Sequence, residues 1–238
     1  MKIKYVVLNF FITLYDNCSY LYFSSRDSMR IVKILKKSDL KKLLSTIKGP
    51  QSPSIELEQY ETPVQLASDI LWTASTAFND IPGKIVVDLG CGTGRLALGA
   101  ALLGAHYVIG VDVDFKLVKD AKNYARKLGL LQSVEFIVAD VRYFWLRRKI
   151  DTVLQNPPFG VHRRGADLKF LDKALEISRI IYTIHKAATA DFIEKHIKKK
   201  KGTITLKALG IITIPRLHRH YKRRVYEVQV VVYRVSTT

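Results

Sequence analysis

Residues 84–100 read KIVVDLGCGTGRLALGA, and this stretch decides the fold. Its first half is a short apolar run with the length of a buried strand, and its second half continues as a helical pattern. Gly90, Gly92 and Gly94 stand between the two halves, where glycine permits a tight turn and a close approach of the backbone to another group. A strand, a glycine-rich turn and a helix in this order predict the first unit of an open α/β sheet.

The same alternation of strand and helix patterns continues on both sides of this stretch. Further strands are predicted at residues 106–113, 134–141, 150–160, 180–186, 203–215 and 223–235. Helices are predicted at residues 31–47, 64–78, 91–105, 114–130, 166–179 and 189–202. Helices of this length between strands predict parallel βαβ units, and the hairpin-like link between the last two strands makes one of them antiparallel. Before the second helix, Thr62 is the expected N-cap and Pro63 lies in the first turn.

The composition is that of a strongly basic globular protein. The chain has 238 residues, 48% of them hydrophobic, which is enough for one α/β domain with a substantial core. Lys and Arg total 39 against 21 Asp and Glu, a formal charge of +18. Such an excess favours a polyanionic partner, most often nucleic acid, over the alternative of a merely solvated basic surface.

Cysteine usage and the amino terminus bear on location. Cys18 and Cys91 form neither a metal-ligand pattern nor a disulfide framework, so we expect no metal and a reducing, cytoplasmic location. No apolar run reaches the length of a membrane span, so no membrane is expected as a partner. Met29 opens a sequence that reads as an ordinary start. We therefore interpret residues 1–28 as an N-terminal extension or start-site artefact, and residues 29–238 as a single domain that includes the N-terminal helices.

Three aspartates follow the ends of predicted strands. Asp112 ends the strand after the glycine loop, about 20 residues on, where a carboxylate can accept both hydroxyls of a ribose. Asp140 ends the next strand, and Asp88 precedes the glycines. Three carboxylates around one ligand disfavour a pyrophosphate and suit a cation such as S-adenosylmethionine. The alternative is that the three residues only cap helices and turns.

A fourth strand pattern ends in an unusual hexapeptide, QNPPFG, residues 155–160. A plain turn needs neither the side-chain amide nor the aromatic ring. The ordered set DLGCGTG, VDVD, VAD and QNPPF resembles the Rossmann-type, S-adenosylmethionine-dependent adenine-N6 methyltransferases. With LEQYETP, GADLKFL and IYTIHK, the chain from about residue 31 onward is similar to the methyltransferase-like-5 family. Characterised members of that family methylate one adenine in small-subunit ribosomal RNA.

The resemblance implies a fold and a set of cofactor contacts. The fold is a seven-stranded, mostly parallel sheet of order 3-2-1-4-5-7-6 with one antiparallel strand. Asp112 contacts the ribose, and Asp140 with the backbone of Val141 reads the adenine end. The remaining expected cofactor-binding residues are Gln59, Thr62, Asp88, Gly90, Gly92, Thr93, Gly94 and Arg95. Two positions depart from the family pattern: Thr93 replaces a cysteine of some relatives, and Arg95 replaces a small apolar residue, which could alter the packing of the loop.

The resemblance also gives the hexapeptide a chemical role. The lone pair of an exocyclic adenine amine is delocalised into the ring, so the amine must be shaped toward tetrahedral geometry. The Asn156 amide oxygen and the Pro157 carbonyl can each accept one of its N–H groups, and the proline ring keeps that carbonyl aimed. Phe159 can stack on the base. We therefore expect Asn156, Pro157, Pro158 and Phe159 to form the catalytic motif, acting by positioning and electrostatic preorganisation.

Basic clusters and one edge strand point to partners. The expected RNA contacts are His162, Arg163, Arg164, Lys198, Lys199, Arg219, Lys222 and Arg223, and the alternative for each cluster is a solvated face. The order implied by the resemblance leaves strand 134–140 at the edge, where family members pair with a small zinc-binding activator subunit. Two rival functions stay open: a methyltransferase of another planar nitrogen, in DNA adenine, tRNA guanine or protein glutamine, and a non-catalytic RNA-binding module.

Overall fold

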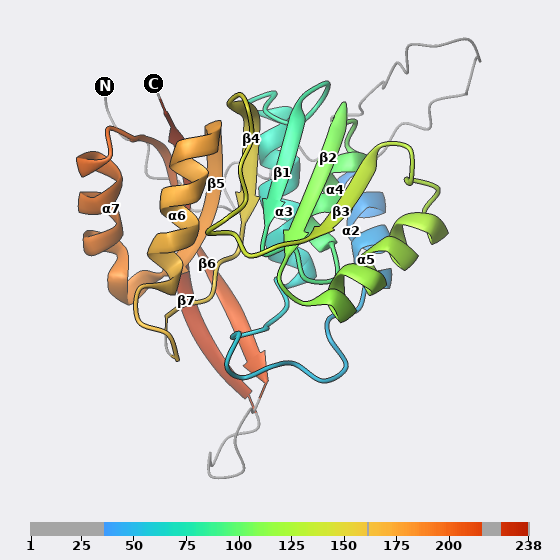
Figure 1. Ribbon diagram of the computed structural model, residues 1–238, viewed down its shortest axis with the longest axis horizontal. Helices are drawn as coiled ribbons and strands as arrows, with labels where there is room; N and C mark the ends of the chain where they lie inside the picture. Colours follow the sequence, from blue (N-terminus) through green and yellow to red (C-terminus); the bar gives the residue numbers. More distant parts are fainter. Residues whose placement is uncertain (1–35, 161, 216–224, 238) are drawn as a thin grey trace.

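Seven strands form one twisted sheet in the computed structural model, which describes residues 36–160, 162–215 and 225–237 (Figure 1). The strands are β1 (Ile85–Leu89), β2 (Tyr107–Asp112), β3 (Val134–Val138), β4 (Ile150–Gln155), β5 (Ser178–Lys186), β6 (Thr203–Pro215) and β7 (Val225–Ser236). Their order is β3-β2-β1-β4-β5-β7-β6. The first five strands are parallel, and β7 is antiparallel to both β5 and β6. The predicted order and the edge position of β3 are confirmed.

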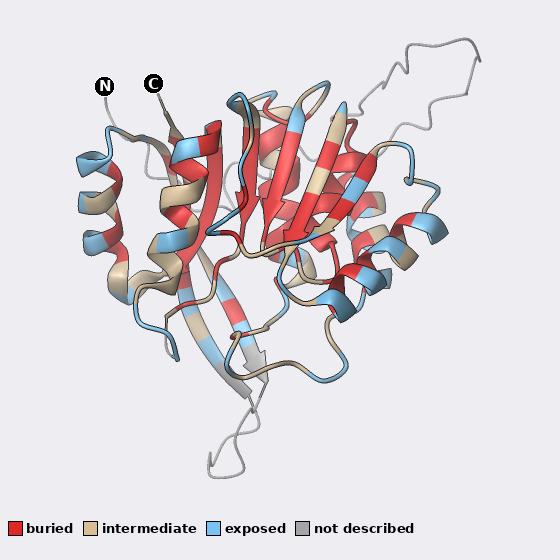
Figure 2. Cartoon of the chain, viewed as in Figure 1, coloured by how far each residue is buried: buried red, intermediate tan, exposed pale blue. Residues whose placement is uncertain are grey.

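Helices cover both faces of the sheet, as βαβ crossovers require. They are α2 (Lys37–Thr46), α3 (Val64–Thr76), α4 (Arg95–Leu102), α5 (Phe115–Lys127), α6 (Ala166–Ile177), α7 (Ala190–Lys199) and the short 3₁₀ helix η1 (Ala187–Thr189). The core on one face joins α2, α3, α4 and α5, with Trp72 at its centre. The core on the other face joins α6 and α7. Figure 2 shows buried residues along the inner sides of these helices and through the central strands.

One face is covered in part without a helix. Residues 139–149, which connect β3 to β4, contain no helix and cross the face of the sheet beside α6 (Figure 1). Val141 and Phe144 are buried in the same core as α6. This segment is therefore anchored by Val141 and Phe144, and Ala139 and Leu146 also pack against the same core.

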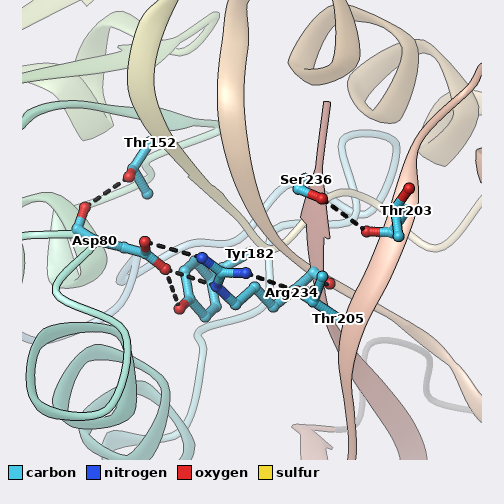
Figure 3. Close-up of polar contacts among 7 residues, drawn as sticks. All are labelled: Asp80, Thr152, Tyr182, Thr203, Thr205, Arg234 and Ser236. Atoms are coloured by element: carbon cyan, nitrogen blue, oxygen red, sulfur yellow. Dashed lines mark hydrogen bonds and ion pairs between the residues drawn. The ribbon is translucent and has the colours of Figure 1, made fainter. Parts of the chain in front are cut away.

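A buried ion pair ties the turn before β1 to the far side of the sheet (Figure 3). Asp80 Oδ2 accepts from Tyr182 Oη at 2.6 Å and from Arg234 Nε at 2.7 Å. The Asp80 carbonyl accepts from the Thr152 hydroxyl at 2.6 Å, and Arg234 donates to Thr205 Oγ1 at 2.7 Å. These bonds link β4, β5, β6 and β7 through one aspartate, because burial requires every charge to find a partner.

The β6–β7 pair extends past the other strands at one end of the sheet. β5 ends at Lys186, opposite Val230 of β7, whereas β6 and β7 stay paired as far as Pro215 and Val225. The extension lies at the end of the sheet where β4 and β5 have their carboxyl ends. The hairpin residues Arg219, Lys222 and Arg223, like residues 1–28, lie outside the described residues.

One predicted cap is wrong. The N-cap of α3 is Pro63, which makes no side-chain capping bond, and the helix starts at Val64. The Thr62 hydroxyl instead accepts a hydrogen bond from Asn156. The hydroxyl that local sequence predicted as a helix cap is therefore used in a hydrogen bond between residues far apart in the chain. Among the described helices, none combines the length and hydrophobicity that crossing a membrane requires.

Candidate active site

A cavity of about 240 Å³ lies at the carboxyl ends of the parallel strands. Ligands of open α/β sheets bind at this end of the strands, at the point where the strand order reverses and successive connections leave in opposite directions. Its wall is formed by residues 56–62, the glycine loop, Asp112, residues 139–142 and Asn156. Pro158, Arg163, Lys169 and Phe170 complete it. Among the described residues, no group of three or more His, Cys, Asp or Glu side chains is placed to hold a metal ion.

The glycine loop has the left-handed backbone that its sequence predicts. The φ angles of Gly90, Gly92 and Gly94 are 71°, 54° and 88°. A Cβ at Gly94 would stand 2.9 Å from the ring of Phe136, so this glycine is also needed for packing. A Cβ at Gly92 would meet nothing within 4 Å, so only the backbone conformation requires glycine there. The buried residue between them, Thr93, lines the cavity.

Asp88 is the penultimate residue of β1, just before this loop. Its Oδ2 accepts from the Ala97 amide at 2.9 Å, and its buried Oδ1 has no hydrogen-bond partner among the described residues. Burial raises the pKa of this carboxyl from 3.8 to about 7, and the nearby Asp112 carboxylate adds to the rise. A buried acceptor of this kind at a cavity wall suits a cationic ligand, which would stabilise the charged carboxylate.

Asp112 ends β2 and fixes two turns. Its Oδ2 accepts from the Gly92 amide at 2.8 Å, and its Oδ1 accepts from the Asp114 amide at 2.9 Å. Burial raises the pKa of this carboxyl. Each carboxylate oxygen keeps a further lone pair, so the group can still accept from hydroxyls in the cavity. Gln59 approaches from the other side and donates to Asp114 Oδ2 at 2.9 Å.

Asp140 lies just past β3 and is paired within its own turn. Arg142 Nε contacts both of its carboxylate oxygens, at 3.0 and 2.9 Å. Hydrogen bonds from Arg142 lower the pKa of the Asp140 carboxyl. Asp140, Val141 and Arg142 all line the cavity. The sequence predicted Asp140 and Val141 as cofactor-binding residues, but it did not predict Arg142.

Arg95 opens α4 and is buried, which is unusual for a cation. Its guanidinium donates to the carbonyls of Thr62 and Ile47 and pairs with Glu61. Burial lowers its pKa to about 10. The side chain therefore joins α4 to the end of α2 and to the segment before α3, which gives this departure from the family pattern a structural role.

Asn156 follows β4 with its amide oriented by Thr62. The Asn156 Nδ2 donates to Thr62 Oγ1 at 3.0 Å. The Asn156 Oδ1 is buried and has no hydrogen-bond partner among the described residues. Because Asn156 lines the cavity, its amide oxygen is an acceptor held ready for a donor that enters there.

The rest of the hexapeptide is held by a pair of residues from the segment before α3. Tyr60 Oη accepts from the Phe159 amide at 3.0 Å and donates to Glu58 Oε2 at 2.8 Å. Glu58 Oε1 accepts from the His162 amide at 2.8 Å. Glu58 is buried and has a φ of 49°, a conformation that non-glycine residues rarely adopt. Glu58 was not predicted from the sequence, because no sequence pattern indicates a buried glutamate in a left-handed turn.

The motif residues are not equally placed. Pro158 lines the cavity, whereas Pro157 and the ring of Phe159 are buried. The Phe159 ring lies 5.0 Å from the Tyr60 ring, centroid to centroid, and the Lys186 ammonium lies 5.6 Å from its centroid. The structure thus brings Asn156 and Pro158 to the cavity and sets Phe159 behind them.

The basic residues lie at two opposite ends of the sheet, one group at the carboxyl ends and one at the amino ends of the parallel strands. His162, Arg163 and Arg164 are exposed beside the cavity, and Arg163 lines it. Lys198 and Lys199 end α7 next to the start of β6, which pairs through β7 with the amino end of β5. They therefore lie at the edge opposite the cavity.

The residues of the cavity fit S-adenosylmethionine. Asp88 offers an unpaired buried carboxylate oxygen to a cation, and Asp112 keeps lone pairs that can accept from hydroxyls. Leu117, Val111 and Val141 supply apolar surface for a purine ring. These features match a nucleoside that carries positive charge better than a pyrophosphate.

Comparisons with known proteins agree with this geometry. Residues 81–221 match the family model described as a methyltransferase domain. The chain is 41% identical over 213 residues to an uncharacterized protein of Methanocaldococcus jannaschii, covering 85% of this chain and 95% of that one. It is 38% identical, with a TM-score of 0.79, to a crystal structure titled as a candidate RNA methyltransferase from Pyrococcus horikoshii, covering 87% of this chain and all of that one.

A further relative carries a specific name. The chain is 32% identical over 208 residues to the rRNA N6-adenosine-methyltransferase METTL5 of Danio rerio, and the match covers 86% of this chain and 100% of that one. The chain belongs to the methyltransferase family that includes the METTL5 rRNA N6-adenosine-methyltransferases.

Proposed function

We propose that this protein transfers the methyl group of S-adenosylmethionine to the N6 amine of an adenine in RNA, and that this RNA is small-subunit ribosomal RNA. The observation that carries the proposal is the buried, unpartnered Oδ1 of Asn156 at the cavity wall. An amide oxygen in this position needs a donor, and an exocyclic amine supplies one. The name of the Danio rerio relative supports the choice of adenine and of ribosomal RNA.

The chemistry assigned to the chain is positioning. When bound, S-adenosylmethionine supplies a methyl group on a positively charged sulfur. Asn156 Oδ1 accepts one N–H of the target amine, and the carbonyl of Pro157 accepts the other, so that the nitrogen lone pair points at the methyl carbon. The C–N bond would form as the C–S bond of the cofactor breaks, and the methylated amine would then lose one proton to water. Phe159 supports the loop from behind, and Pro158 forms the wall beside the base.

The proposed cofactor contacts belong to residues of the cavity wall. Asp112 would bind the ribose hydroxyls, and Asp140 with Val141 would bind the adenine end. Asp88 would face the amino-acid part, whose ammonium suits a buried carboxylate. Gln59, Thr62, Gly90, Gly92, Thr93 and Gly94 would complete the site. Arg95 contributes through its backbone, because its side chain is engaged with Thr62, Ile47 and Glu61.

Two partners belong to the proposal. RNA would lie over the exposed residues His162, Arg163 and Arg164 beside the cavity. A small zinc-binding activator subunit would pair with β3, which is an edge strand with Val138 exposed at its end. Co-expression with such a subunit should raise the yield of soluble, non-aggregated protein. Full activity and dispersion of the isolated chain would contradict this partner. We also propose a cytoplasmic location, where an enzyme of ribosomal RNA would meet its substrate.

The decisive experiment measures methyl transfer from labelled S-adenosylmethionine to purified small ribosomal subunits and to naked ribosomal RNA, with nucleoside analysis of the product. We expect N6-methyladenosine from the wild type. Asn156→Ala should lose this product while retaining cofactor binding, measured by calorimetry. Unchanged activity of Asn156→Ala would overturn the proposed role, and a different methylated nucleoside would overturn the proposed substrate.

A further inference from the structure

The segment from Arg142 to Lys149 presents two aromatic rings to solvent. The side chains of Tyr143 and Trp145 are 79% and 69% exposed, although both are large and mostly apolar. Between them Phe144 is buried, and after them Leu146 is half-buried. Single exposed apolar residues are common on protein surfaces, but two exposed rings two residues apart on one anchored segment are not a scattered pair.

The segment is firmly attached to the body of the protein. The amides of Tyr143 and Phe144 donate to the Asp140 carbonyl at 3.0 and 3.2 Å. Val141 and Phe144 fill the core beneath it. The two rings therefore stand on a rigid base, and a ligand that stacks on them would not need to order the segment first.

Cations surround the rings. The sequence of residues 142–149 is RYFWLRRK, with four basic residues and no acidic one. The Arg142 guanidinium lies 5.3 Å from the centroid of the Tyr143 ring, so one face of this ring carries a cation–π contact. Arg147 and Arg148 are exposed, and no ion pair of theirs is recorded within the described residues. A surface on which exposed rings lie close in sequence to exposed arginines complements a polyanion that has planar bases.

The segment continues directly from the proposed active site. Asp140, Val141 and Arg142 line the cavity, and Tyr143 is the next residue. Lys169 of α6 and Arg163 line the same cavity from the other side of its mouth. Arg142 therefore lies both at the cavity and beside the Tyr143 ring. The segment that carries it crosses the sheet beside α6, where no helix covers the face (Figure 1).

We propose that Tyr143 and Trp145, flanked by Arg142, Arg147 and Arg148, form a stacking site for an unpaired nucleobase of single-stranded RNA that flanks the methylated adenine. This inference rests on the proposed function, because it adds a second contact for the same RNA. The rings would stack on the base, and the arginines would contact the neighbouring phosphates. A neighbouring base held in this way would help to keep the target adenine extruded from its stack.

The two tryptophans of the chain make this site directly observable. Trp72 is buried in the core at 1% exposure, so Trp145 is the tryptophan that solvent and ligand reach. We expect a short single-stranded oligoadenylate to quench the exposed tryptophan emission of the full-length chain. Trp145→Phe should abolish this quenching and keep most of the RNA affinity, because a ring remains at the position.

Affinity measurements with matched variants complete the test. Trp145→Ala should raise the Kd for fluorescein-labelled oligoadenylate about 5-fold or more, the size of one base–aromatic stack. Phe192→Ala is the matched control, because Phe192 is also an exposed ring but lies on α7, beyond α6 (Figure 1). It should leave the Kd unchanged. Circular dichroism of both variants shows that the fold is kept.

The outcomes separate this proposal from the proposed function. If the wild type binds and methylates RNA but its tryptophan emission does not respond, or if Trp145→Ala binds like Phe192→Ala, the stacking site is overturned and the methyltransferase stands. If the wild type neither binds nor methylates RNA, the proposed function itself fails. If a co-purified protein and not RNA changes the emission, the rings belong to a protein interface, and the stacking site is also overturned.

Discussion

At the scale of single residues, the site depends on how one amide is turned. The sequence predicted Asn156 as an acceptor because QNPPFG follows a strand in a chain that also has the glycine loop and spaced aspartates. It did not predict Thr62 as the residue that orients the amide, since local pattern assigned that hydroxyl to a helix cap. The contact joins residues 94 positions apart, and such pairings follow from tertiary structure rather than from spacing.

Replacing Thr62 should therefore affect the chemical step. Thr62→Val keeps the shape of the side chain and removes the acceptor of the Asn156 Nδ2 hydrogen bond. We expect kcat to fall about 5-fold, the value of one ordinary hydrogen bond, while the KM for RNA stays near that of the wild type. Thr62→Ser keeps the hydroxyl and should retain most of the activity. Steady-state kinetics that show a changed KM with normal kcat would contradict this role.

Asp88 should make cofactor binding depend on pH. Burial raises its pKa to about 7 in the free protein, so a proton competes with a cationic ligand below that pH. We expect the affinity for S-adenosylmethionine to rise between about pH 6 and about pH 8, and to level off above. Isothermal titration across this range measures it, and Asp88→Asn should bind weakly with a flatter profile. An equally steep profile in the variant would contradict the assignment.

The same shift has a consequence for the stability of the free protein. The folded state holds the proton of Asp88 more tightly than the unfolded state, whose carboxyl has an ordinary pKa. Stability therefore falls as the pH rises from about 4 to about 7, and this contribution is absent in Asp88→Asn. Thermal unfolding of both proteins across that range, without cofactor, checks the sign.

At the scale of elements, most of the fold could be predicted because strand and helix periods are local. The strands before and after the glycine loop, and the antiparallel final pair, all lie where the apolar runs placed them. The polar bonds across the sheet could not be predicted. Asp80, Tyr182 and Arg234 come from a turn and two strands, and only the assembled sheet brings them together.

This buried pair should hold the two halves of the sheet together. Arg234→Met removes the partner of a buried carboxylate, and we expect a loss of about 3–5 kcal/mol in the free energy of unfolding. Asp80→Asn with Arg234→Met should lose less than Arg234→Met alone, since no unpaired charge then remains. Glu176→Gln, which breaks a more exposed pair with Lys173, is the control and should change stability by no more than about 1 kcal/mol. Urea unfolding measures all three, and a neutral Arg234→Met would contradict the role.

At the scale of the whole molecule, the charge of +18 predicts a polyanionic partner but not where it lies. The fold supplies that information by sending chain segments to opposite edges of the sheet. Arg163 and Arg164 follow β4 beside the cavity, whereas Lys198 and Lys199 come before β6 at the far edge. Two basic clusters that are similar in sequence therefore differ in their distance from the candidate active site.

The two clusters should contribute unequally to RNA binding. The double variants Arg163→Gln/Arg164→Gln and Lys198→Gln/Lys199→Gln remove the same charge from exposed positions, so their global electrostatic effect is matched. If RNA lies across the cavity mouth, only the first should lose direct phosphate contacts, and its plot of log Kd against log salt should become shallower by about 0.7 per lost contact. The second should shift the Kd slightly and keep the slope of the wild type. Equal losses in both variants would mean that RNA covers both edges of the sheet, and a loss confined to the lysine variant would place the RNA on the edge opposite Asn156, where the proposed reaction could not reach it.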